Sequence, residues 1–281
     1  MEKIVVTTDF SGNSKAGIRF AIQLSNQLGY ELIFYHVIEV MKPTSWNDKH
    51  YKKFASQLIS NNTKKLEQFV EQICHENGIV KSNYQYIAEI GTEVKEMVIK
   101  QAKKVKAGYI CMSTHGAGKI KKLFGTHASS LVTTSPIPVF VIPKNYRIKP
   151  ITKIFYASDF AAIKKELDIV RNFAKPFKAV IEVYHYNYLL HVEEERKKLQ
   201  RKADALKAPG VTFIFERQEV ESTLATHLRD DIKRKKPSIV ILFTKPNRNW
   251  FDRLFAKRES AEMTFNAKVP MLVFRKKTTR A

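Results

Sequence analysis

The amino-acid sequence carries the same pattern twice, which constrains the fold more than any other feature. The segment Lys3–Phe10 returns 150 positions later as Lys153–Phe160, and Phe34–His36 returns 149 positions later as Val183–His185. Later segments match in the same order in both halves. Such ordered self-similarity indicates an internal duplication. We therefore expect the chain to fold as two copies of one domain.

Each half alternates apolar segments with segments of helical periodicity. Short apolar runs typical of buried parallel strands alternate with helices that carry one apolar face. This alternation predicts an α/β fold with two tandem Rossmann-like domains, each a five-stranded, mostly parallel sheet with helices on both faces. We place the domains at residues 1–143 and 151–281 and interpret the polar segment Lys144–Pro150 as the linker. In the first half the expected strands are 3–8, 31–38, 84–90, 109–112 and 137–142, with helices at 16–28, 54–73, 94–105 and from about 126.

Composition narrows the classes of protein. The chain has 281 residues and a net charge of +22, which favours polyanionic partners. Its basic clusters are scattered over expected helix ends, so solvated helix faces explain them better than a nucleic-acid surface, which stays an alternative. No apolar run is long enough for a membrane span, and no signal peptide is evident at the N-terminus. With only two cysteines, no disulfide framework is expected, so we predict a cytoplasmic protein.

The loop after the expected strand Tyr109–Met112 is the main candidate site. This strand leads into a segment with three glycines, and a helix can start at Gly125-Thr126. Glycines let a backbone approach phosphate closely, and a helix N-terminus favours negative charge. The segment is not a P-loop, because Ser113 and Ile120 stand where that motif needs a glycine and a hydroxyl residue. A simple two-glycine turn is the alternative.

Taken together, these segments resemble a tandem universal stress protein. Family repeats open with a strand that ends near an aspartate, continue to a His-Val strand end, and carry a glycine loop before a final Pro-Val strand. The matching segments here occur in that order: Thr8–Ser11, His36-Val37, Ser113–Gly116, Gly125-Thr126 and Pro138-Val139. The resemblance covers both halves, and it implies domains of the adenine nucleotide alpha hydrolase-like kind.

The resemblance implies a site for ATP or another adenine nucleotide, with or without Mg²⁺, in the first half. By position in the family motif, the nucleoside would contact Thr8, Asp9 and Val37. The phosphates would be lined by Met112, Ser113, His115, Gly116, Gly125 and Thr126, and Gly118 lies in the same loop. An aspartate at the carboxyl end of a parallel strand also suits this role physically, since its carboxylate accepts hydrogen bonds from ribose hydroxyls.

Two departures from the family pattern bear on this prediction. Ser113 replaces the first glycine of the motif, and eight residues rather than nine separate Gly116 from Gly125. In the second half Pro246 replaces the phosphate-cradling glycine, and proline has no N–H to offer. Asp159 remains there, where it can cap the next helix. We therefore expect the second half not to bind nucleotide.

Other candidate residues have simpler explanations. His36 and His185 stand at equivalent strand ends, and the sequence around them lacks the further ligands that a metal needs. We interpret both as packed strand-end histidines. Cys111 lies in an apolar strand, where a packing role is favoured over a nucleophilic one.

The sequence thus predicts a stress-response protein that binds an adenine nucleotide for regulation, with no enzymatic activity beyond a slow ATPase. The alternative from another class is a nucleotide-free interaction protein whose partner contacts the aromatic segment with Trp250 and Phe251. The protein partner is not identified. The last strands of the halves are expected to pair as a pseudo-dimer within the chain, and a homodimer of two chains is compatible with this.

Overall fold

A computed structural model describes most of the chain, in seven stretches. The described residues are 1–41, 47–79, 84–114, 126–187, 192–217, 224–244 and 269–276. The chain divides into two compact units, Met1–Ile148 and Lys149–Ala281. Each is described here by itself.

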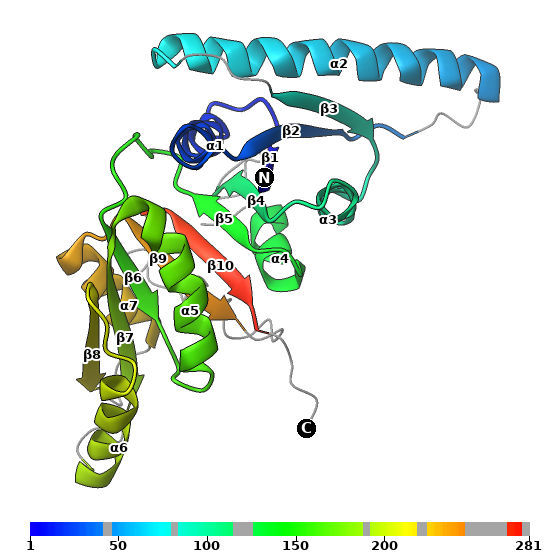
Figure 1. Cartoon of the computed structure of the whole chain (residues 1–281). Helices are drawn as coiled ribbons and strands as arrows, with labels where there is room; N and C mark the ends of the chain where they lie inside the picture. The colour runs from blue at the N-terminus through cyan, green and yellow to red at the C-terminus, as the bar shows by residue number, and fades with distance from the viewer. Residues whose placement is uncertain are drawn as a thin grey trace. The chain divides into compact units, whose positions relative to one another are not determined.

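The first unit contains a five-stranded sheet in the order β3-β2-β1-β4-β5 (Figure 1). Every described pair of neighbouring strands is parallel. Its elements are β1 (Lys3–Thr7), α1 (Lys15–Leu28), β2 (Glu31–Ile38), α2 (Asp48–Glu76), β3 (Gln85–Ile90), α3 (Val94–Lys104), β4 (Tyr109–Ser113), α4 (Thr126–Thr134) and β5 (Val139–Ile142).

The second unit repeats this order as β8-β7-β6-β9-β10, again with parallel neighbours. The predicted fold class is therefore confirmed for both halves. Its elements are β6 (Lys153–Ala157), α5 (Ile163–Ala174), the short 3₁₀ helix η1 (Lys175–Phe177), β7 (Val180–Asn187), α6 (Glu193–Asp204), β8 (Val211–Arg217), α7 (Leu224–Lys235), β9 (Ile239–Thr244) and β10 (Met271–Arg275).

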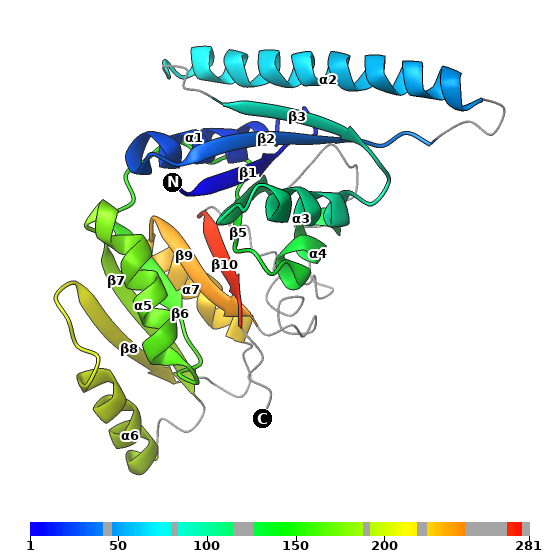
Figure 2. The same ribbon diagram turned by 45° about the vertical axis from the view of Figure 1, so that its right-hand side comes forward.

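Helices cover both faces of each sheet, as expected for strands that are apolar on both sides. In the first unit α1 contacts α2 on one face, and α3 contacts α4 on the other. In the second unit α5 and α7 lie on opposite sides of the sheet in both views (Figures 1 and 2). The central strand β1 is fully buried through Ile4, Val5 and Val6.

Helix α1 shows how the sequence sets an element's limits. Its apolar residues recur every three or four positions and are buried against the sheet. It ends at Gly29, which adopts a left-handed conformation (φ 69°) and donates its N–H to the carbonyl of Ser25. Glycine takes this conformation without strain, so the predicted stop at Gly29 is confirmed.

The segment interpreted as a linker contributes to the first unit. Tyr146 is 3% exposed, and its ring packs edge-on against Phe20 of α1. Its hydroxyl donates a 2.6 Å hydrogen bond to Gln23, and Arg19 donates to its carbonyl oxygen. The polar composition of the segment concealed this anchor, because a single aromatic residue leaves no periodic signal.

Among the described residues, no helix has the length and apolarity needed to cross a bilayer.

Candidate functional site

The carboxyl ends of β1 and β4 meet where the strand order of the first sheet reverses. The chain passes from β1 to β2 on one side, and β4 lies on the other side. Open α/β sheets bind ligands outside the strand ends at such a point. Val6 pairs with Cys111. Two residues further toward the carboxyl ends, the same parallel register brings Thr8 beside Ser113. Asp9 follows at the rim, where it is exposed.

The turn after β1 is held by its own side chains. The hydroxyl of Thr8 accepts the N–H of Phe10 at 3.1 Å and shares a 2.8 Å hydrogen bond with the hydroxyl of Ser14. One carboxylate oxygen of Asp9 accepts the N–H of Ser11 at 3.0 Å. These bonds support Phe10 at φ 61°, which is rare for a bulky residue. Thr8 thus builds the turn, and the turn presents Asp9.

An aromatic cluster lies behind this turn. The ring of Phe10 lies 4.3 Å from His36 and 5.6 Å from Phe69 of α2, and the ammonium of Lys65 lies 4.5 Å from its centroid. His36 donates from Nδ1 to the carbonyl of Thr8 at 2.8 Å, which fixes its tautomer since a carbonyl only accepts. Burial lowers the pKa of His36, so its neutral form is favoured. His36 is a packed strand-end histidine, as predicted.

Ser113 faces helix α1. Its hydroxyl accepts the N–H of Gly17 at 2.9 Å and donates to the carbonyl of Ser14 at 3.3 Å. A Cβ on Gly17 would lie 3.0 Å from that hydroxyl and 3.2 Å from the carbonyl carbon of Met112. Gly17 therefore allows the close approach of α1 to β4. Sequence reasoning missed this glycine, because its partner lies 96 residues away.

The remaining predicted residues divide into those that the structure describes and those that it does not. Val37 and Met112 are half-buried near the ends of β2 and β4. Thr126 begins α4, which confirms the predicted helix start. Four predicted residues and the side chain of Thr126 lie outside the described residues: His115, Gly116, Gly118 and Gly125.

Within the described part of the chain, no group of three or more His, Cys, Asp or Glu side chains is gathered as a metal would require. Cys111 is fully buried and its thiol contacts the carbonyl of Gly17 at 3.4 Å. Burial raises the pKa of this thiol well above its usual range, which suits the packing role predicted for it.

The second unit repeats the turn with different neighbours. The hydroxyl of Ser158 accepts the N–H of Phe160, which has φ 59°, and Asp159 accepts the N–H of Ala161 at 3.0 Å. His185 hydrogen-bonds the carbonyl of Ser158 at 2.9 Å, as His36 does to Thr8. Asp159 thus closes this turn, and Ala162 at the N-cap of α5 makes no side-chain capping bond. Pro246 lies outside the described residues.

Comparisons with known proteins agree with this fold. The sequence profile of the universal stress protein family matches residues 1–143. A universal stress protein from Archaeoglobus fulgidus DSM 4304 superposes with a TM-score of 0.66 at 15% identity, covering 97% of this chain and 98% of that one. A functionally unknown protein from Pseudomonas aeruginosa PAO1 gives a TM-score of 0.58 at 13% identity, covering 98% and 92%.

At these identities the two solved structures bear on the fold alone, and both extend over the two halves. No curated protein matches the sequence significantly. The family profile covers more than half of the chain. The protein belongs to the universal stress protein family.

Proposed function

We propose that the first unit binds ATP or another adenine nucleotide at the carboxyl ends of β1 and β4 and that binding serves regulation. One observation carries the proposal. Asp9 is exposed at the strand-order reversal, on a turn that hydrogen bonds hold in place before any ligand arrives. A pre-formed acceptor there loses little conformational entropy when ribose hydroxyls bind it.

The phosphate end of the site rests on the chain that joins β4 to α4. The sequence of this segment contains Gly116, Gly118 and Gly125, and α4 begins at Thr126. Backbone N–H groups at a helix start attract phosphate oxygens. Lys119 and Lys121 in the same segment add positive charge, which supports a triphosphate with or without Mg²⁺.

A regulatory role and a cytoplasmic location complete the proposal. Both cysteines are buried free thiols, which suits a reducing compartment. The exposed group at the proposed site is a carboxylate at the end of β1, and the neighbouring hydroxyls of Thr8 and Ser113 are engaged in the turn and in α1. This arrangement supports binding more than hydrolysis, and any ATPase activity would be slow.

Titration calorimetry with Mg-ATP on the full chain tests the proposal. Gly116→Val with Gly125→Val should abolish binding, because side chains there block close approach of the phosphates. Ala256→Val is the matched control, since Ala256 stands at the equivalent place in the second half, and it should bind like the wild type. Unchanged affinity in the glycine variant would mean that the site is misplaced.

The alternatives keep their own tests. The segment with Trp250 and Phe251 lies outside the described residues, and Trp250→Ala with Phe251→Ala tests whether it binds a protein partner. Nucleic-acid binding would weaken steeply with salt. The pseudo-dimer within the chain and the homodimer stay predictions.

A further inference from the structure

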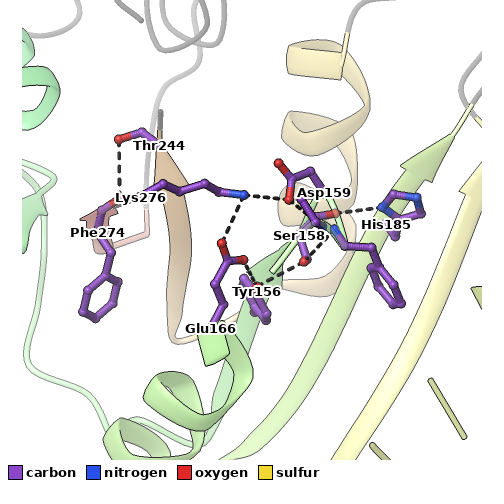
Figure 3. Close-up of polar contacts among 10 residues, drawn as sticks. Tyr156, Ser158, Asp159, Glu166, His185, Thr244, Phe274 and Lys276 are labelled. Atoms are coloured by element: carbon purple, nitrogen blue, oxygen red, sulfur yellow. Dashed lines mark hydrogen bonds and ion pairs between the residues drawn. The ribbon is translucent and has the colours of Figure 1, made fainter. Parts of the chain in front are cut away.

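The acid that follows β6 has an internal partner in the second unit. The ammonium of Lys276 lies 2.6 Å from the carboxylate of Asp159 and 3.1 Å from that of Glu166 (Figure 3). Lys276 directly follows β10, and Glu166 lies on α5. We call this arrangement of Lys276, Asp159 and Glu166 the lysine bridge.

The side chain of Lys276 crosses the strand ends to make these contacts. In the second sheet β9 lies between β10 and β6, and two strand spacings are about 10 Å. The backbone N–H of Lys276 donates to the carbonyl of Thr244 at the end of β9, which anchors the start of the side chain. The ammonium therefore lies over the boundary between β9 and β6. In the first unit the equivalent boundary between β4 and β1 is the proposed nucleotide site.

The lysine bridge is largely shielded from water. The side chain of Lys276 is 13% exposed and that of Glu166 is 6% exposed. The hydroxyl of Tyr156 donates to the second oxygen of Glu166 at 2.5 Å, and it also contacts Ser158 at 3.1 Å (Figure 3). A buried carboxylate needs such partners, since an unpaired one costs several kcal/mol. The cluster thus satisfies both oxygens of Glu166.

The described part of the first unit does not repeat this bridge. At positions equivalent to Tyr156 and Glu166 it has Val6 and Ala16, both fully buried. The buried anion that draws an ammonium into the second unit therefore has no counterpart there. Lys144 stands at the position of the repeat that corresponds to Lys276, and it is exposed.

We propose that Lys276 is a built-in occupant of the strand-end site in the second unit, where it holds Asp159 as a structural partner and closes this site to ligands. Both halves thus have an aspartate after their first strand, and the two aspartates have different roles. In the second unit Asp159 stabilises the fold through the lysine bridge. Where the nucleotide proposal holds for the first unit, the chain binds one nucleotide rather than two.

Thermal unfolding of the full chain tests the bridge without any ligand. Lys276→Met keeps an unbranched side chain one heavy atom shorter and removes its charge, leaving Glu166 buried without this cation. Its unfolding midpoint should fall by about 10 °C, with faster hydrogen exchange in β6 and β10. Adding Glu166→Gln should restore most of the loss, because the amide oxygen still accepts from Tyr156.

Lys207→Met is the matched control. Lys207 also lies 2.6 Å from a carboxylate, that of Asp204, but its side chain is 68% exposed. Exposed pairs contribute little, so the midpoint should change by about 2 °C or less. Equal shifts for Lys276→Met and Lys207→Met, or no rescue by Glu166→Gln, would overturn the structural role of the bridge.

A matched pair of aspartate variants tests the closed site. Asn keeps the oxygen that accepts the turn N–H in each unit and removes the negative charge. Asp159→Asn should lower the midpoint and leave the affinity for Mg-ATP unchanged. Asp9→Asn, at an exposed position, should leave the midpoint unchanged and weaken the binding of Mg-ATP about tenfold. Loss of affinity in Asp159→Asn would overturn the proposal. Absence of binding in the wild type would refute the nucleotide proposal and leave the stability test valid.

Discussion

The two units share one turn and use its aspartate differently. In both, a hydroxyl residue and an aspartate after the first strand hold a phenylalanine at positive φ, and a histidine of the next strand bonds the turn carbonyl. In the first unit Asp9 is exposed, and the buried residues Val6 and Ala16 stand at the positions equivalent to Tyr156 and Glu166. In the second unit Asp159 lies over a buried glutamate and pairs with a lysine.

This difference teaches that an aspartate after the first strand is not by itself evidence for a ligand. The turn needs its carboxylate oxygen in both halves, so the residue type follows from backbone geometry. What decides the role is the residue on the following helix. Ala16 leaves the strand-end boundary without a fixed anion, whereas Glu166 draws an ammonium across it.

The largest expected effect comes from exchanging that helix residue. Ala16→Glu places a carboxylate where the side chain is 0% exposed. Among the described residues of the first unit no lysine takes the place of Lys276, since Lys144 is exposed, so this charge should cost about 3–5 kcal/mol of unfolding free energy. Glu166→Ala in the second unit should cost less than half as much, since Lys276 keeps Asp159. Urea unfolding measures both variants, and equal losses would show that the two positions are equivalent after all.

Removing the tyrosine hydroxyl sharpens the comparison. Tyr156→Phe leaves one oxygen of the buried Glu166 without its donor, which should cost about 2 kcal/mol. Tyr35→Phe in the first unit is the control, because Tyr35 donates at 2.8 Å to Glu89, which is only half-buried. Water can replace the lost hydroxyl there, so a smaller loss is expected. A larger loss for Tyr35→Phe would contradict the view that burial makes the difference.

The sequence predicted the strands and helices well because their signals are local. The strand β2 is predicted at 31–38 and is Glu31–Ile38, since a nearly all-apolar run leaves little choice. The helix after the glycine loop was expected from about 126 and begins at Thr126. The parallel direction of the strands followed from their alternation with helices, whereas the order of the strands is known from the structure.

Contacts between distant residues could not be predicted in this way. Lys276 belongs to a basic cluster that looked like solvated surface, yet its partner Asp159 lies 117 positions away. Nothing in the sequence distinguishes Glu166 from other charged residues of a helix. Only the packed structure shows that the side chain of this glutamate is 6% exposed and needs a cation. The bond between Gly17 and Ser113 escaped for the same reason.

A smaller effect is expected where α1 approaches β4. Gly17→Ala places a Cβ 3.0 Å from the hydroxyl of Ser113 and 3.2 Å from the backbone of Met112. Overpacking of this kind should outweigh the gain in helix propensity and cost about 1 kcal/mol. Gly12→Ala is the control, since nothing lies within 4 Å of a Cβ there. A stabilised Gly17→Ala variant would mean that α1 shifts freely.

The smallest effect is a dependence of stability on pH that the two units should share. Burial lowers the pKa of His36 and of His185 below the ordinary value of 6.5. The unfolded chain therefore binds more protons than the folded one just below that value. The contribution of the two histidines to the unfolding free energy is complete above pH 6.5 and should decline as the pH falls toward the lowered pKa values.

Two variants test this dependence on pH. His36→Asn, whose amide can replace the Nδ1 donor, and His185→Asn should each reduce the change of unfolding free energy with pH between pH 7 and 5.5. Because both histidines bond the same turn carbonyl, similar reductions are expected. A reduction in only one variant would mean that the two turns differ in more than the use of their aspartates.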